Sequence, residues 1–468
     1  MMHTAAALPL APAADSTAAR LADLLARDLD FHDQGNGCSA HHIHSFPARF
    51  PPQLPREFIT ALTQPGQVVL DPMFGSGTTV LEARLGGRQA VGFDIDPLAV
   101  LLGQVKTTPL DAAVARQAGV EAAARAARAV KKERDALERF RARRWGESSR
   151  RFMDYWFAPT TQWELTALMR EIEGVAETDV RAFLLTAFSA TIIARSRGVS
   201  LAVDLAHTRP HRVQAALSPT GKVLFGQVAA SGTVRNHHQV KVIYPVLGEF
   251  RRRVRYVARG LLADLPAEPL PLLGFGNAQA LPLADAVVDL IVTSPPYAGN
   301  AIDYMRAHKF SLVWMGYLID DLGQRRKRYI GDESLQNVMF APLPPRTAGI
   351  VAGIGERDVR KGRILHRYYS EMTRVLAEMH RVLRPGAAAI LVVGNSVMRG
   401  LSTETHHCLA EMGAALGFTV PDIGVRQLDR NRRMMPAANK HDPHSPIQRR
   451  MHTEYVIGLY KMRTTRNG

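Results

Sequence analysis

Residues 67–84 read QVVLDPMFGSGTTVLEAR, and this stretch decides the fold class. Its first four residues form the short apolar run of a buried strand, Gly75 and Gly77 permit a tight turn, and a helical pattern follows. A strand, a glycine-rich turn and a helix in this order bring backbone N–H groups close to a bound ligand. A phosphate-binding loop is excluded because no lysine follows the second glycine, and the dinucleotide pattern G-x-G-x-x-G fails at Val80.

A second strand is predicted at residues 90–93, and it ends at Asp94. An acid at the tip of the second strand of a doubly wound sheet is placed to accept hydrogen bonds from ribose hydroxyls. The predicted ligand is therefore a nucleoside without a phosphate chain. S-adenosylmethionine fits that description.

The pentapeptide TSPPY, residues 293–297, follows an apolar run at residues 287–292 that two prolines end abruptly. The face of Tyr297 can stack on a planar ring. The Ser294 hydroxyl and a backbone carbonyl can accept hydrogen bonds from an amino group. Taken alone, the pentapeptide also fits the end of a proline-terminated core strand.

Residues 71–79 and 293–297 together resemble the cofactor and catalytic motifs of the amino-group DNA methyltransferases. The serine that heads the second motif resembles the cytosine-N4 branch, whereas the adenine-N6 branch more often has Asp there. Residues 44–54 resemble the segment that closes over the methionine end of the cofactor, and residues 381–386 resemble the helix-to-strand turn of the sheet. The resemblance implies an α/β fold with a doubly wound, mostly parallel, seven-stranded Rossmann-like sheet, interrupted by a largely helical insertion.

The resemblance also implies the site residues. The catalytic group comprises Ser294, Pro295, Pro296 and Tyr297, with no metal required. Asn277 stands where an acid is common, and its amide oxygen can still accept a hydrogen bond from an adenine amino group. The residues expected to bind S-adenosylmethionine are Phe50, Asp71, Pro72, Phe74, Gly75, Ser76, Gly77, Thr78, Thr79, Asp94, Asp96, Asn277, Ala278 and Thr293.

Five segments are expected along the chain. An N-terminal extension (1–40) includes a helix at residues 16–30, and the cofactor-binding first part of the methyltransferase domain (41–108) follows. A basic, helical insertion (109–265) opens with one long helix over residues 111–144, polar on most faces and interpreted as a solvated structural helix. The catalytic second part (266–462) and a short tail (463–468) complete the chain.

Charge favours a polyanionic partner. The chain carries 59 Lys and Arg against 43 Asp and Glu, a formal net charge of +16, which attracts nucleic acid. An arginine-rich composition inherited from a GC-rich genome also fits this total. In the resembling enzymes the spare segment recognises double-stranded DNA. The expected contacts are Arg195, Arg197, Arg209, Arg325, Arg326, Lys327, Arg328, Arg432 and Arg433, each able to read guanine or to hold phosphate.

Composition excludes other classes of protein. Two cysteines give no disulfide framework, and the N-terminus lacks the basic start of a secretory signal. No apolar run of about 18 residues predicts a membrane span. A zinc site at Cys38 and its neighbouring histidines is disfavoured because no second close cysteine is present. We expect a bacterial cytoplasmic or nucleoid location, with a monomer and a homodimer equally open.

The predicted function is site-specific methylation of cytosine N4 in duplex DNA, after the base has been flipped out of the helix. Residues 298–304 are expected to form a lip over the target pocket. Three alternatives stay open: an adenine-N6 DNA methyltransferase, an RNA guanine-N2 methyltransferase, and a non-catalytic DNA-binding module that keeps the fold.

Overall fold

The computed structural model describes residues 16–32, 38–46, 50–194, 196–203, 205, 210–227, 240–262, 265–266, 268–299, 303–428 and 453–463. In this part of the chain the main sheet has eight strands, in the order β13-β15-β10-β9-β1-β2-β8, with β14 also paired to β15. That is one strand more than predicted. None of the helices described is long and apolar enough to cross a membrane.

The parallel half of the sheet is centred on β1 (Val68–Asp71). It pairs with β2 (Gln89–Asp94) on one side and with β9 (Val288–Thr293) on the other. Beyond them lie β8 (Leu272–Phe275) and β10 (Leu383–Gly394), also parallel to their neighbours. The carboxyl ends of these strands therefore share one edge, where open α/β sheets bind ligands.

The antiparallel half is built on β15 (Thr453–Lys461), which pairs with β10. The short strand β13 (Phe418–Thr419) and β14 (Ile423–Gln427) both pair with β15. The apolar run at residues 455–460 lies within β15.

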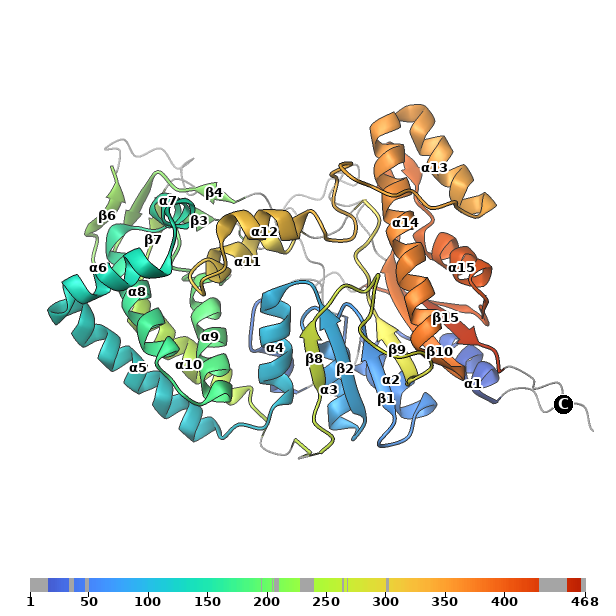
Figure 1. Ribbon diagram of the computed structural model, residues 1–468, viewed down its shortest axis with the longest axis horizontal. Coiled ribbons are helices and arrows are strands. Elements are labelled where there is room, and N and C mark those ends of the chain that lie inside the picture. Colours follow the sequence, from blue (N-terminus) through green and yellow to red (C-terminus); the bar gives the residue numbers. More distant parts are fainter. Residues whose placement is uncertain are drawn as a thin grey trace, which may run out of the picture.

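Side chains alternate between two apolar cores, one on each face of the sheet. Val69 and Leu290 point into one core, and Leu70 and Ile291 into the other, as expected for strands covered on both faces. The first core is covered by α1 (Ser16–Leu25), α2 (Gln53–Leu62), α3 (Thr78–Leu85) and α4 (Pro97–Thr107). The second is covered by α14 (Val359–Val382) and α15 (Thr405–Ala415) (Figure 1).

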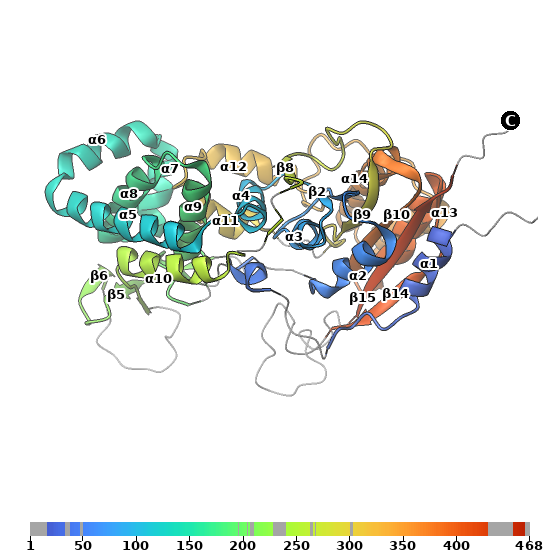
Figure 2. The same cartoon turned by 90° about the horizontal axis from the view of Figure 1, so that it is seen from below.

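The insertion is largely helical. Its helices are α5 (Ala112–Lys132), α6 (Arg134–Arg144), α7 (Glu147–Trp156), α8 (Pro159–Glu173), α9 (Thr178–Ile192) and α10 (Val246–Arg259). Its short strands are β3 (Ala202–Val203), β4 (His211–Arg212), β5 (Ala215–Leu217), β6 (Val223–Gly226) and β7 (Val240–Val242). The insertion lies beside the β8 edge of the sheet (Figures 1 and 2).

The single long helix predicted for residues 111–144 is wrong in two respects. The backbone leaves the helical region at Glu133, which separates α5 from α6. The helix is also not solvated all round, because Ala115, Ala122 and Ala126 are fully buried among the contacts that α5 makes with α8 and α10. An alanine stripe lets helices approach closely although each residue adds little hydrophobicity. The N-terminal helix also ends earlier than predicted, at Leu25.

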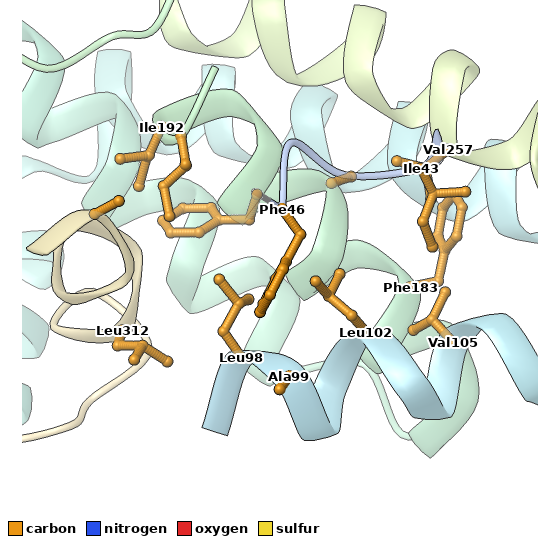
Figure 3. Close-up of a cluster of buried hydrophobic side chains, with 14 of the residues drawn as sticks. Ile43, Phe46, Leu98, Ala99, Leu102, Val105, Phe183, Ile192, Val257 and Leu312 are labelled. Carbon is orange, nitrogen blue, oxygen red and sulfur yellow. The ribbon is translucent and has the colours of Figure 1, made fainter. Parts of the chain in front are cut away.

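One continuous core joins the insertion to the sheet. Figure 3 shows the ring of Phe46 between Leu98 and Leu102 of α4, and Phe183 of α9 beside Val105 of the same α4 helix. Helix α4 leads directly out of β2, so it links the cofactor half of the sheet to the insertion. The insertion is therefore packed against the site and is not a separate body on a linker.

Three helices follow β9 before α14: α11 (Met305–Leu312), α12 (Ile319–Arg326) and α13 (Pro345–Arg357). Helix α11 contacts α4 and α9, and α12 contacts α7. The 3-10 helix η1 (Ser39–His42) and the strands β11 (Val397–Met398) and β12 (Leu401–Ser402) complete the described elements.

Candidate active site

The two motifs meet at the carboxyl ends of neighbouring strands. The hydroxyl of Thr293, the last residue of β9, donates a 2.7 Å hydrogen bond to the carboxylate of Asp71, the last residue of β1. The same carboxylate accepts a 3.1 Å bond from the Met73 N–H. Burial raises the pKa of Asp71 to about 6. The glycine-rich loop and the TSPPY loop are thus fastened together at their roots.

The glycine-rich loop needs its glycines. Gly75 and Gly77 have φ of +49° and +80°, in the left-handed region that side chains disfavour. A Cβ on Gly77 would lie 3.4 Å from the Cα of Gly103 in α4. The buried Lys106 of α4 donates a 2.5 Å hydrogen bond to the carbonyl of Ser76. This bond fixes the glycine-rich loop to α4.

Asp94 closes the loop from the neighbouring strand. One carboxylate oxygen accepts a 2.8 Å bond from the Gly75 N–H, and the other accepts a 2.8 Å bond from the Asp96 N–H. Burial, followed by the charge of Asp96, raises the pKa of Asp94 to about 7. Each oxygen keeps a further lone pair, so two vicinal hydroxyls can be accepted by this one carboxylate.

Asp96 is already engaged by the protein. Its carboxylate accepts the Leu98 N–H at 2.9 Å as the N-cap of α4, and it contacts Nδ1 of the buried His308 at 2.6 Å. The charge and hydrogen bond of His308 hold the pKa of Asp96 below its usual range. Asp96 supports Asp94 through its backbone N–H, and each of its carboxylate oxygens has a partner within the protein.

The residues present fit S-adenosylmethionine. Asp94 offers acceptors for its ribose hydroxyls. The helix α3, which begins at Thr78 behind the Gly77 turn, offers N–H groups for its carboxylate. The ionised Asp71 suits a neighbouring ammonium group. Ser76 and Thr78 contribute hydroxyls to the same loop, 3.3 Å apart.

Other residues expected to bind the cofactor have varied surroundings. Phe74 is buried, with its ring against Gly92 and Gly103, so it packs β2 on α4. Asn277 is exposed, and its side chain accepts the Gln279 N–H at 3.0 Å. Ala278 is buried in the core on the far face of the sheet. Phe50 is partly buried against the core beside α2, Pro72 is buried in the loop, and Thr79 is buried in the first turn of α3.

In the TSPPY loop, Pro295 is buried while Ser294, Pro296 and Tyr297 are partly exposed. The Tyr297 hydroxyl donates a 2.8 Å bond to Glu454, the second residue of β15. Burial, followed by the charge of Glu454, raises the pKa of Tyr297 well above its ordinary value, so this phenol stays protonated. Glu454 is in turn ion-paired with the buried Arg426 of β14.

The expected lip folds against the cofactor side of the site. Tyr304 stacks on Phe46 with ring centroids 5.0 Å apart, and His308 lies 5.0 Å from the same ring. The charges of Asp94 and Asp96, after burial, raise the pKa of Tyr304. The helix that follows the expected lip is joined to Asp96 through His308; residues 300–302, within the expected lip, lie outside the described residues.

The basic residues expected to contact DNA divide into four groups. Arg195, Arg209, Arg432 and Arg433 lie outside the described residues. Arg197 is ion-paired with Glu249 at 3.3 Å, and Arg326 with Asp303 at 2.7 Å. Arg325 lies over the exposed ring of Phe275. Lys327 and Arg328 are exposed at the end of α12, without a carboxylate partner in the described part of the chain.

Glu454, Arg426, His308 and Lys106 carry no motif, and sequence reasoning missed them. Each is a buried polar residue inside an otherwise apolar element, and its partner is distant in the chain. No cluster of three or more His, Cys, Asp or Glu that could hold a metal ion occurs among the described residues. His41 contacts Glu82 at 2.7 Å and His44 contacts Ser189 at 3.0 Å.

Comparison with known proteins adds to this geometry. A family model described as DNA methylase matches residues 26–104. Type II methyltransferase M.MvaI of Kocuria varians is 23% identical over 391 residues, which is 80% of each chain. Type II methyltransferase M.XycI of Xanthomonas campestris pv. cyanopsidis is 51% identical over 53 residues, 11% of this chain and 18% of that one.

Type II methyltransferase M.PvuII of Proteus hauseri is 42% identical over 60 residues, 13% of this chain and 18% of that one. Among solved structures, a TehB-like SAM-dependent methyltransferase from Corynebacterium glutamicum aligns with 87% of this chain and 86% of its own at 10% identity. Its TM-score of 0.27 is too low to bear on the fold.

Proposed function

Because the chain belongs to the amino-group DNA methyltransferases, we propose that it methylates the N4 amino group of cytosine at a specific site in duplex DNA. S-adenosylmethionine is its cofactor and supplies an electrophilic methyl group. The observation that carries the proposal is the 2.7 Å bond from Thr293 to Asp71, which joins the base-facing loop to the cofactor-facing loop. Cytosine is favoured over adenine by the serine at position 294.

The protein's contribution to the reaction is position and charge. In this proposal the Ser294 hydroxyl and the Pro295 carbonyl accept hydrogen bonds from the amino group of a flipped base, and Tyr297 stacks on its ring. These acceptors orient the nitrogen lone pair and stabilise positive charge as it develops there. Proline supplies rigidity and removes N–H groups that would compete for the acceptors.

The DNA surface is proposed to lie along the carboxyl edge of the strands. Lys327 and Arg328 are exposed at the end of α12, a helix that packs on α7 of the insertion (Figure 1). The insertion would contribute Arg197 and the basic segments around it to target recognition. We place this activity in the bacterial cytoplasm or nucleoid, where DNA is available, and relate it to restriction-modification because the relatives are named type II methyltransferases.

The test is transfer of labelled methyl groups to unmethylated genomic DNA, followed by mass spectrometry of the nucleosides. N4-methylcytosine is the expected product. N6-methyladenine would replace the cytosine assignment while keeping the enzyme class. If no methyl group is transferred to any DNA, the proposed DNA methyltransferase activity is rejected, whether or not RNA is methylated.

Two variants localise the chemistry. Ser294→Ala and Tyr297→Ala should lower turnover about 100-fold, since each removes a contact made to the reacting base. The affinity for S-adenosylmethionine should stay within about twofold of wild type, because neither side chain faces the ribose acid. Wild-type turnover in both variants would contradict the assignment.

A further inference from the structure

The phenol of Tyr297 is held by a buried charge pair that belongs to neither motif. Its hydroxyl donates a 2.8 Å bond to one oxygen of Glu454, whose other oxygen is paired with Arg426. The Glu454 and Arg426 side chains are 11% and 3% exposed. Burying two charges costs desolvation free energy unless their geometry is good and their other hydrogen-bonding groups are bonded. The position of this pair next to Tyr297 therefore calls for a functional explanation.

The sheet explains how the pair is positioned. Glu454 and Arg426 are register partners on the antiparallel strands β15 and β14, so their side chains lie on the same face. Arg426 also donates a 3.2 Å bond to the carbonyl of Leu29, in the chain that follows α1. Arg426 is held by the pairing of β14 with β15 and by its bond to Leu29, and it in turn fixes the Glu454 carboxylate.

The tyrosine is thereby fastened at both ends. Pro295 and Pro296 restrict the backbone before it, and Glu454 holds the hydroxyl at the tip of the ring. The phenol O–H prefers to lie in the plane of the ring, so an acceptor fixed beyond the hydroxyl favours one rotation of the ring about its long axis. A stacking surface that is already oriented costs less entropy when a base binds.

We propose that Glu454, seated by Arg426, is the positioning residue that sets the plane of the Tyr297 ring for the target base. The inference rests on the proposed function. Glu454 touches neither substrate nor cofactor in this account and acts only through the tyrosine. It should therefore affect turnover and the state of the flipped base, but not cofactor binding.

The substitutions must not leave a buried charge unpaired. Glu454→Leu combined with Arg426→Met removes both charges while keeping side-chain volume. Turnover on unmethylated genomic DNA should fall about tenfold, because the ring loses a hydrogen bond to a charged acceptor. Glu454→Gln combined with Arg426→Met keeps an acceptor oxygen for the phenol without a buried charge, and should retain turnover within about threefold of wild type.

A background without the hydroxyl distinguishes positioning from general damage. Tyr297→Phe keeps the ring and should itself lower turnover about tenfold. In that background the double substitution should cause no further loss, since the bond is already absent. A matched pair in the insertion, Arg125→Met with Glu171→Leu, removes an ion pair of 3.0 Å and should leave turnover unchanged.

A signal from the base itself supplies the second readout. DNA with 2-aminopurine at the target position, chosen from the methylated sites of the wild-type protein, should show altered fluorescence in the Glu454/Arg426 double variant and in Tyr297→Phe alike. Unchanged turnover and fluorescence in the double variant would overturn the inference. So would an additive loss in the Tyr297→Phe background. An inactive wild-type protein would instead reject the proposed function, and the positioning role with it.

Discussion

The ionisation of Asp94 should control cofactor affinity near neutral pH. Its carboxylate lies in a buried site beside Asp96, and its pKa is raised to about 7. Ribose hydroxyls donate to the ionised form, so affinity should rise as pH rises through this value. With a pKa of about 7, roughly one-tenth of the protein is ionised at pH 6 and nine-tenths at pH 8, which predicts about tenfold weaker binding at pH 6.

Isothermal titration calorimetry with S-adenosylmethionine from pH 6 to pH 8 measures this change. Asp94→Asn is the control, because it keeps one acceptor oxygen and cannot titrate in this range. Titration of the ligand's amino group affects binding to the wild-type protein and to Asp94→Asn equally. The ratio of the two affinities therefore reports the ionisation of Asp94. Asp71, with a pKa of about 6, contributes about twofold at the acid end.

The same pKa shift fixes the sign of a stability change. An acid whose pKa is raised in the folded state binds its proton more tightly there than in the unfolded state. As the pH rises from about 4 to about 7, the free energy of unfolding of the ligand-free protein should therefore fall. Affinity that is flat from pH 6 to pH 8, or a slope that Asp94→Asn shares, would refute this account of the ribose site.

Three further substitutions test the loop, the DNA surface and the insertion. Gly77→Ala should weaken cofactor binding and lower the stability by about 1 kcal/mol, because φ is +80° there; Gly323→Ala in α12, with nothing within 4 Å, is the calorimetric control and should not. Lys327→Ala with Arg328→Ala should reduce the slope of log affinity against log salt by about 2 if both hold phosphates, as filter binding will show; an unchanged slope excludes them. Gly119→Ala should cost about 1–3 kcal/mol in denaturant unfolding, since its Cβ would lie 2.6 Å from Val254. Adding Val254→Ala should restore stability, and failure to do so would contradict the α5–α10 packing.

The predictable parts of this structure are those that depend on the local backbone and on the order of strands and turns. Gly75 and Gly77 identify the turn, and a strand end identifies Asp94, since both follow from backbone geometry and not from distant partners. Asn277, expected at the cofactor site, follows β8, which comes after the insertion in sequence and pairs with β2 in the sheet.

What could not be predicted depends on partners brought from elsewhere in the chain. No glycine or proline marks the break at Glu133, whose side chain is paired with Arg170 of α8 at 2.9 Å. The buried alanines of α5 look like a weakly apolar helix until α10 and α8 cover them. Glu454 resembles any acidic residue near a strand end until Tyr297 and Arg426 are seen on either side of it.

The placement of the insertion also has a consequence for how the chain folds. Strands β2 and β8 are neighbours in the sheet, but residues 95–271 separate them. Closing so long a segment as a disordered loop carries an entropic cost that grows with its length. Helices α5, α8 and α10 contact one another within that segment, so collapse of the insertion shortens the effective distance between the strands. We therefore expect the insertion to assist completion of the sheet, and truncating it should slow folding.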